Sequence, residues 1–454
     1  MPSAQELDAH HKALTLNLDP SIFGSFAEIG AGQEVAHWFF LVGGASGTVA
    51  KTISAYDKEV SDDLYGSGSR YVSRQRLEAM LDREWDQLVT QLSQTRGPKT
   101  RFFCFVDTVS TRNFAGTNDP HGWVGLRFQM QPGGPPNNVL LHINMRDSAN
   151  VMQQQAIGIL GVNLIYTAFY ERHNVESFLA SLAQEVVKER IEIDYVDLDG
   201  PAFERWDRRS LLARLVSGGF AEATFFPSKG PTVPPTEALY KRAVVLAPGY
   251  FGRVAQSQVH MQLLVSAMQE LQKEMGETKI APAGFFCLTA SPFTSDEAAP
   301  EIPDLLRRIN ALLAAGGDVL LFSQRELYQM TGLVHRYTQA PVRFVAGLSL
   351  IIRAFEDVYG NLEGRLLEAL ARLFAQNVRI YAYPMTAMDL REKLKGISAL
   401  GWEWSETNGL VSATQLRHAA PLGHLLAYLL ASNFIVPMQA PATRGGNGGS
   451  SLKR

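Results

Sequence analysis

Hydrophobic spacing predicts helices over most of the first hundred residues. Apolar positions recur at three- to four-residue intervals over residues 74–94, after Ser73, which is placed to cap the start of one long amphipathic helix. Shorter segments of helical spacing lie at residues 33–42 and 48–60, separated by Gly43, Gly44 and Gly47. The N-terminal region is therefore expected to be helical.

After residue 100 the pattern changes to short apolar or alternating runs, which predict strands at residues 101–109, 122–130 and 139–145. A connector rich in proline and glycine (131–137) joins the last two, and such a connector favours antiparallel neighbours. Further elements of this mixed α+β region are predicted as helices at 150–170, 175–188 and 208–216 and strands at 191–198 and 223–226.

Beyond residues 228–235, where prolines and a glycine interrupt both helix and sheet, the pattern becomes regular. Amphipathic helices alternate with five apolar strands, predicted at residues 243–247, 284–288, 319–322, 342–346 and 378–383. This alternation is typical of a parallel sheet covered on both faces. The sequence predicts an α/β protein: a mixed α+β domain with a helical N-terminus (1–235), a doubly wound, Rossmann-like parallel-sheet domain (236–438) and a disordered tail (439–454).

Composition narrows the classes of protein that the chain can belong to. A net charge of −3 gives no bulk electrostatic argument for binding nucleic acid or an anionic membrane. No export signal and no uncharged apolar run of about 18 residues is present, which argues against a membrane protein. The two cysteines, Cys104 and Cys287, lie in separate strand-like runs and are expected to be reduced. These features predict a cytoplasmic protein.

The paired strands around residues 121–146 carry the first candidate site. Alternation places His142 and Arg146 on one face of their strand, and Arg127 of the neighbouring strand can join them, with His121 at the strand entry. Arginine and histidine side chains that converge in this way suit a phosphate or a carboxylate. The alternative is a solvent-facing sheet surface, whose polar residues alternate only because water solvates them.

The second candidate site lies at the strand ends of the regular region, where doubly wound folds bind ligands. Gly249 and Gly252 follow the first strand and allow close approach of a ligand to the backbone, and Arg253 precedes the next helix. The spacing G-x-G-x-x-G is missing here, so a dinucleotide fingerprint is not predicted.

Two other segments favour structural interpretations. Lys51 follows the glycine-rich segments around residues 30–32 and 43–47, but its spacing from the glycines differs from a phosphate-binding loop, and no strand is predicted before them. Asp107 is predicted to end an apolar strand, as the nucleophile of haloacid-dehalogenase-type phosphatases does, but Val109 replaces the second aspartate of that motif. Tight helix–helix turns and a strand-end cap are the expected roles.

The histidines form no metal-binding spacing, and the G-x-S-x-G elbow of serine hydrolases is missing. No metal site is therefore predicted, and the sequence indicates neither a cofactor nor a catalytic residue.

Five segments resemble a bacterial family of uncharacterised proteins, and the likeness runs from about Leu16 to about Met438. The segments are residues 23–35 (FGSFAEIGAGQEV), 47–57 (GTVAKTISAYD), 70–74 (RYVSR), 121–128 (HGWVGLRF) and 361–364 (NLEG). Members of this family often carry the labels "TonB-dependent receptor" or "nicotinate-nucleotide adenylyltransferase".

Neither label agrees with the residues. An outer-membrane receptor needs an export signal and about twenty-two alternating strands, which the sequence does not predict. An adenylyltransferase of that superfamily needs an H-x-G-H or T-x-G-H turn after its first strand, whereas Gly423-His424 lies near the C-terminus.

Two function hypotheses follow. The first is an enzyme, such as a transferase, or a sensor, which binds a small anionic metabolite or nucleotide between the two domains. The second is a non-catalytic scaffold that forms homo-oligomers through its glycine-rich N-terminal helices.

Overall fold

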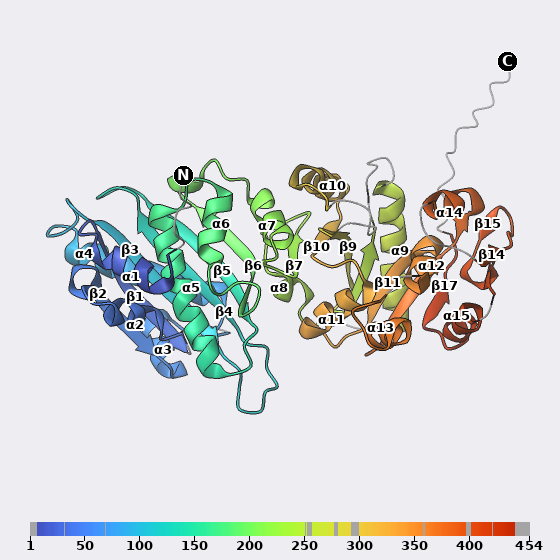
Figure 1. The fold of residues 1–454 in the computed structure, drawn as a ribbon, viewed down its shortest axis with the longest axis horizontal. Coiled ribbons are helices and arrows are strands. Elements are labelled where there is room, and N and C mark those ends of the chain that lie inside the picture. Colours follow the sequence, from blue (N-terminus) through green and yellow to red (C-terminus); the bar gives the residue numbers. More distant parts are fainter. Residues whose placement is uncertain are drawn as a thin grey trace, which may run out of the picture. The chain divides into compact units, whose positions relative to one another are not determined.

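The computed structural model describes residues 7–30, 32–68, 70–249, 251, 257–276, 280–291, 299–356, 359–395, 401–419 and 421–440. Two compact units divide the chain, which we call unit 1 (Met1–Thr224) and unit 2 (Phe225–Arg454) (Figure 1). Within the described residues, no helix is long and apolar enough to cross a membrane. The predicted tail lies outside the described residues from 441 onward.

Unit 1 contains a six-stranded sheet in the order β2-β1-β3-β4-β5-β6. Strand β1, second from one edge, is parallel to both β2 and β3, and the remaining neighbours are antiparallel. The predicted antiparallel pair therefore exists as β4 and β5. The strands are β1 (Ile22–Gly30), β2 (Val49–Ala55), β3 (Arg101–Ser110), β4 (His121–Gln129), β5 (Pro136–Met145) and β6 (Ile191–Asp199).

Helices pack against this sheet from two sides. Helix α4 contacts β1, β3 and β4 through Leu77, Met80, Leu81 and Trp85, which belong to a buried cluster with Trp123. Ser73 caps α4 as predicted, by accepting a hydrogen bond from the backbone N–H of Arg76. Helix α5 contacts β4 and packs with α1, α2 and α6. The helices of unit 1 are α1 (Ala9–Leu18), α2 (Val35–Leu41), α3 (Lys58–Tyr65), α4 (Arg74–Leu92), α5 (Asn150–Tyr170), α6 (Val175–Ala183) and α7 (Arg208–Ser217).

The expectation of an all-helical N-terminus is wrong at two places. Residues 48–60 contain strand β2 followed by the start of α3, and β1 was not predicted at all. Val49 and Ile53 are four residues apart, as on a helix face, but their strand pairs with β1 and leaves alternate residues exposed. The self-association hypothesis assumed a helical N-terminus, and this region contains helices α1 and α2 together with two strands of the sheet.

Unit 2 contains a seven-stranded sheet in the order β17-β12-β11-β8-β9-β10-β7. The pairs from β17 to β10 are all parallel. If the parallel strands are numbered 1 to 6 along the chain, this order is 3-2-1-4-5-6, the Rossmann order. The predicted Rossmann-like fold is confirmed, with strands β7 (Ala223–Phe226), β8 (Val244–Pro248), β9 (Ala283–Thr289), β10 (Asp318–Phe322), β11 (Val342–Gly347), β12 (Val378–Tyr383) and β17 (Ile435–Pro437).

Helices connect the parallel strands because a tight turn cannot join parallel neighbours. They are α8 (Pro235–Leu239), α9 (Ser257–Met275), α10 (Ile302–Ala314), α11 (Leu327–Tyr337), α12 (Leu348–Glu356), α13 (Arg365–Leu373), α14 (Ala387–Lys393) and α15 (Leu422–Ala431). Two small two-stranded sheets precede α15: β13 (Met385–Thr386) with β15 (Leu410–Val411), and β14 (Trp402–Trp404) with β16 (Leu416–His418).

The division between the units falls ahead of the Pro-rich stretch at residues 228–235. Strand β7 is the reason, because it pairs with β10 at one edge of the second sheet. Phe225 packs on Phe285 with a ring-centroid distance of 5.8 Å, and Asp318 accepts hydrogen bonds from the backbone N–H and the hydroxyl of Ser228.

These contacts predict that unit 2 needs β7 to fold fully. A fragment of residues 221–440 is expected to unfold cooperatively, and a fragment of residues 236–440 to be less stable by about 3–6 kcal/mol. The difference corresponds to the lost burial of Phe225 and Phe226, at about 1.5–3 kcal/mol for each side chain. Thermal denaturation followed by circular dichroism compares the two, and equal transition midpoints would place the boundary at residues 228–235.

Candidate functional site

The structure brings together two of the four predicted residues of the paired strands. His121 begins β4, and His142 lies in β5 opposite Trp123. Nδ1 of His121 lies 3.2 Å from Nε2 of His142, so the two rings share a hydrogen bond. The two histidines therefore share one face of the sheet, as predicted, and His142 also contacts the ring of Trp123 at a centroid distance of 5.1 Å.

Arg127 does not join this pair. It lies six residues along β4 from His121, which corresponds to about 20 Å in an extended strand. Its guanidinium donates hydrogen bonds to Asn138 at 2.7 Å and to Asp82 of α4 at 2.9 Å. Strand alternation gives the correct face but not the position along the strand, and the single cluster expected from it does not form.

Arg146 lies just beyond β5 and is paired with two carboxylates. Its Nη2 is 3.0 Å from Oε1 of Glu222 and 3.3 Å from Oε2 of Glu192. Acidic residues of this chain therefore already pair with the positive charge of Arg146 that was expected to bind an anionic ligand. Neither of these acids was among the predicted site residues.

A third residue extends the histidine pair into a chain of hydrogen bonds. Oδ1 of Asp194 lies 2.6 Å from Nδ1 of His142, and both side chains are only 2% exposed. The other carboxylate oxygen of Asp194 accepts a hydrogen bond from Asn144 at 2.9 Å. Asp194 thus fixes the orientation of the His142 ring, whose Nε2 faces His121.

A β-bulge positions Asp194. The pairing of β5 with β6 shifts between His142 and Ile143, so that His142 lies opposite Tyr195 and Ile143 opposite Ile193. Asp194 is the extra residue, and the irregularity turns its carboxylate towards His142 and Asn144. Bulges commonly redirect a side chain in this way, and simple alternation along the sequence does not predict them.

Burial sets the electrostatics of this group. Burial, together with the charge of His142, lowers the pKa of His121 to about 4, so His121 is neutral near pH 7. Burial, together with the neighbouring carboxylate of Asp194, raises the pKa of Glu192 to about 7. Asp194, His142 and His121 thus form one chain of hydrogen bonds. In the part of the chain that the structure describes, no group of three or more histidine, cysteine or acidic side chains is arranged to hold a metal ion.

The alternative of a solvated sheet face is wrong for this part of the sheet. His142, Asp194 and Glu192 are each 2% exposed. The same side of the sheet is covered by α4, whose Arg74 donates hydrogen bonds to Tyr195 and Asp197 of β6. The alternating polar residues therefore form an internal network of ion pairs and hydrogen bonds.

The second predicted site lies at the carboxyl edge of the sheet in unit 2. Gly249 directly follows β8 and is half-buried, and Gly347 ends β11 immediately before α12. Gly252 and Arg253 lie outside the described residues. In the strand order of this sheet, β8 and β11 are adjacent, so Gly249 and Gly347 lie at the carboxyl ends of neighbouring strands.

The glycine-rich segment around residues 30–32 differs from expectation in one respect. Strand β1 does precede it and α2 follows, although no strand was predicted there. Lys51 nevertheless does not serve a phosphate, because its Nζ lies 2.6 Å from a carboxylate oxygen of the fully buried Glu84. The structural interpretation of Lys51 therefore holds.

Asp107 is not a strand-end cap, because β3 continues to Ser110 and the side chain is fully buried. It lies beside Glu28 of β1, whose carboxylate accepts hydrogen bonds from the backbone N–H groups of Val35 and Ala36. Burial and the neighbouring Glu28 raise the pKa of Asp107 well above its usual range. No local sequence pattern predicts this carboxyl pair, since the two acids lie in different strands whose other residues are mostly apolar.

Known proteins resemble only part of this chain. No protein-family model and no curated protein matches it. Three solved structures resemble it over 35–37% of its length and 92–96% of theirs. One is competence/damage inducible protein CihA from Agrobacterium tumefaciens, with 20% sequence identity and a TM-score of 0.24. The others are a CinA superfamily protein from Enterobacter cloacae (12% identity, TM-score 0.27) and a competence or damage-inducible protein from Enterobacter asburiae (13% identity, TM-score 0.25). At these values the likeness concerns the α/β fold class and carries no function to this chain.

The low pKa of His121 predicts how stability depends on pH. The folded protein keeps His121 neutral down to about pH 4, whereas the unfolded chain binds the proton near pH 6.5. Wild type should therefore lose up to about 3 kcal/mol of unfolding free energy from this group as the pH falls through that interval. His121→Gln lacks this loss, and urea unfolding at pH 4 to 7 measures the difference between the two proteins.

Glu192 is predicted to change stability with pH in the opposite direction to His121, and Glu192→Gln tests this. The folded protein keeps Glu192 protonated up to about pH 7, whereas the unfolded chain releases the proton near pH 4.5. This group therefore costs wild type stability as the pH rises through that interval, and Glu192→Gln should gain on wild type over the same range. Curves for both variants that run parallel to wild type would show that neither pKa is shifted in the fold.

Proposed function

We propose that this protein binds a small anionic metabolite or nucleotide at the carboxyl edge of the sheet in unit 2. The observation that carries the proposal is the strand order 3-2-1-4-5-6 of six parallel strands. In such sheets the chain leaves the first strand towards one edge and later returns to build the other half. Ligands bind where these two directions separate, outside the carboxyl ends of the first and fourth strands.

Here these strands are β8 and β11. The chain runs from β8 through α9 to β9, and after β10 it crosses back through α11 to β11 on the other side of β8. The connections on the two sides diverge above the ends of β8 and β11. The helices that follow these strands, α9 and α12, begin at this edge with their N-terminal N–H groups, which favour negative charge.

Two glycines lie at this point. Gly249 follows β8, and Gly347 is the last residue of β11, with α12 beginning at Leu348. The backbone N–H of Gly249 donates to the carbonyl of Cys287. A side chain at Gly249 would meet the ring of Phe251, and one at Gly347 would meet Met385. An anion at this edge would therefore be held by the N–H groups at the starts of α9 and α12. Arg253, which lies outside the described residues, would supply positive charge in the same loop.

The ligand is not proposed to be a dinucleotide held in the usual way. The loop after β8 reads Pro248-Gly249-Tyr250-Phe251-Gly252-Arg253, which lacks the G-x-G-x-x-G spacing that binds a pyrophosphate. A mononucleotide or a phosphorylated or carboxylated metabolite needs only one anion site, and it fits this loop better. Transferase chemistry on such a ligand is part of the proposal.

We also propose that the protein is cytoplasmic. Cys104 and Cys287 are both free and buried in separate sheets, as is usual for reduced proteins.

A thermal-shift panel with phosphate, pyrophosphate, nucleoside mono-, di- and triphosphates and dicarboxylates tests the proposal. A ligand present at a hundred times its Kd should stabilise the protein by about 2.7 kcal/mol, which corresponds to a rise of about 5–10 °C in Tm. Gly347→Asp should weaken that ligand at least about tenfold, because it adds a negative charge at the end of β11. Gly347→Ala separates this charge effect from the contact of the new side chain with Met385, whose Sδ would lie 3.0 Å from the added Cβ.

Gly332→Asp is the matched control, since Gly332 is an exposed residue of α11 with open space around it. It introduces the same charge away from the strand ends and should leave binding unchanged. No stabilisation by any anion, or equal effects of the two aspartates, would contradict a site at the ends of β8 and β11.

A further inference from the structure

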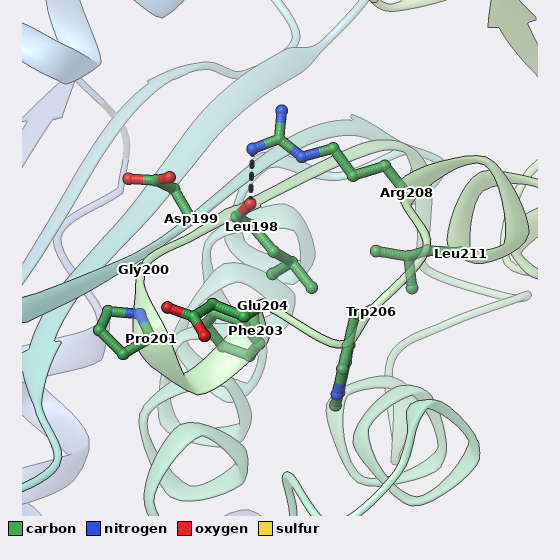
Figure 2. A pocket seen from close by; sticks show the side chains of 9 residues that line it. All are labelled: Leu198, Asp199, Gly200, Pro201, Phe203, Glu204, Trp206, Arg208 and Leu211. Carbon is green, nitrogen blue, oxygen red and sulfur yellow. Dashed lines mark hydrogen bonds between the residues drawn. The ribbon is translucent and has the colours of Figure 1, made fainter.

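A pocket of ≈ 340 Å³ lies in unit 1, where the end of β6 turns into α7 (Figure 2). Its apolar surface includes Leu198, Phe203, Trp206 and Leu211. Trp206 packs on the buried Phe203 with a ring-centroid distance of 5.3 Å while remaining partly exposed. The volume lies within the range of small-molecule sites, and an apolar wall with a few charged groups is typical of them.

The turn that forms this pocket is held rigidly. Gly200 adopts a positive φ of 102°, and a side chain at this position would collide with Asn137 and Pro136 of β5. The side-chain oxygen of the buried Asn137 accepts a hydrogen bond from the backbone N–H of Ala202 at 2.7 Å. The pocket therefore exists before a ligand arrives, which lowers the entropic cost of binding.

Three charged residues line the pocket: Asp199, Glu204 and Arg208. One Nη of Arg208 donates a hydrogen bond to the carbonyl of Leu198 at 2.8 Å (Figure 2). Its other Nη lies 3.1 Å from a carboxylate oxygen of Asp197, which also pairs with Arg74 and is outside the pocket lining. Two carboxylates and one guanidinium thus give the lining a net negative charge.

We propose that this pocket binds a small organic cation, an amine with an aromatic or aliphatic body. The ammonium group would donate hydrogen bonds to the carboxylates of Asp199 and Glu204, and the body would pack against Trp206 and Leu211. An ammonium offers three donors and no acceptor, which matches two carboxylates that only accept. All lining residues lie between positions 198 and 211, so the pocket is separate from the anion site proposed for unit 2.

Three probes that share one ring and differ only in the head group test this proposal on the full chain: phenethylamine, 2-phenylethanol and 3-phenylpropionate. Isothermal titration calorimetry at pH 7 should show saturable binding of the amine, at least about tenfold weaker binding of the alcohol, and no binding of the acid. Equal affinity for amine and alcohol, preference for the acid, or no saturable binding of the amine would overturn the proposal.

Variants locate the binding. Glu204→Gln and Asp199→Asn should each weaken the amine about tenfold, and Trp206→Leu should weaken amine and alcohol alike. Asp86→Asn, at an exposed carboxylate of α4 away from the pocket, is the control and should bind as wild type does. Thermal melting confirms that each variant is folded, and amine binding that survives both carboxylate changes in folded protein would refute the assignment.

Discussion

In both units the first of the parallel strands has a parallel neighbour on each side, and this pairing determines how the chain crosses that part of the sheet. A parallel neighbour cannot be reached by a tight turn, so every such pair requires a crossover that places a helix on the sheet. In unit 1 this strand is β1, second from one edge of the sheet, with β2 and β3 on either side. In unit 2 it is β8, with β9 and β11 on either side. The chain therefore builds the sheet first on one side of this strand and later on its other side. In unit 2 the two sets of connections separate at the carboxyl ends of β8 and β11, where we place the anion site.

The charged residues of unit 1 show why a cluster of basic side chains is weak evidence for a ligand. Arg74, Arg127 and Arg146 each find carboxylates of this chain, on β6, on α4 and beyond β6 respectively. These pairs are partly exposed, so each adds little net stability. Each arginine is nevertheless held by an acid of this chain, so these contacts orient helix and sheet side chains more than they provide a binding surface.

The regular half of the fold could be predicted because its strands are mostly apolar and its helices amphipathic, so that each segment favours one type of element. Strand β1 could not, since Gly24, Ser25 and Glu28 interrupt its apolar residues, and Glu28 is buried only because backbone N–H groups of α2 satisfy it. At the candidate site, alternation gave the face of His142 correctly. The position of Asp194 depends on a bulge between two strands that are about fifty residues apart in sequence, and no local pattern records it.

The central claim is that the carboxyl edge of the sheet in unit 2 holds a small anion, and native mass spectrometry of the purified full chain tests it most directly. The account predicts a second species, heavier than the chain by the mass of one phosphorylated or carboxylated small molecule. Release of that molecule on denaturation and its identification from the same sample would complete the measurement. A spectrum that contains only the mass of the bare chain, both as purified and after incubation with nucleotides, would contradict the account.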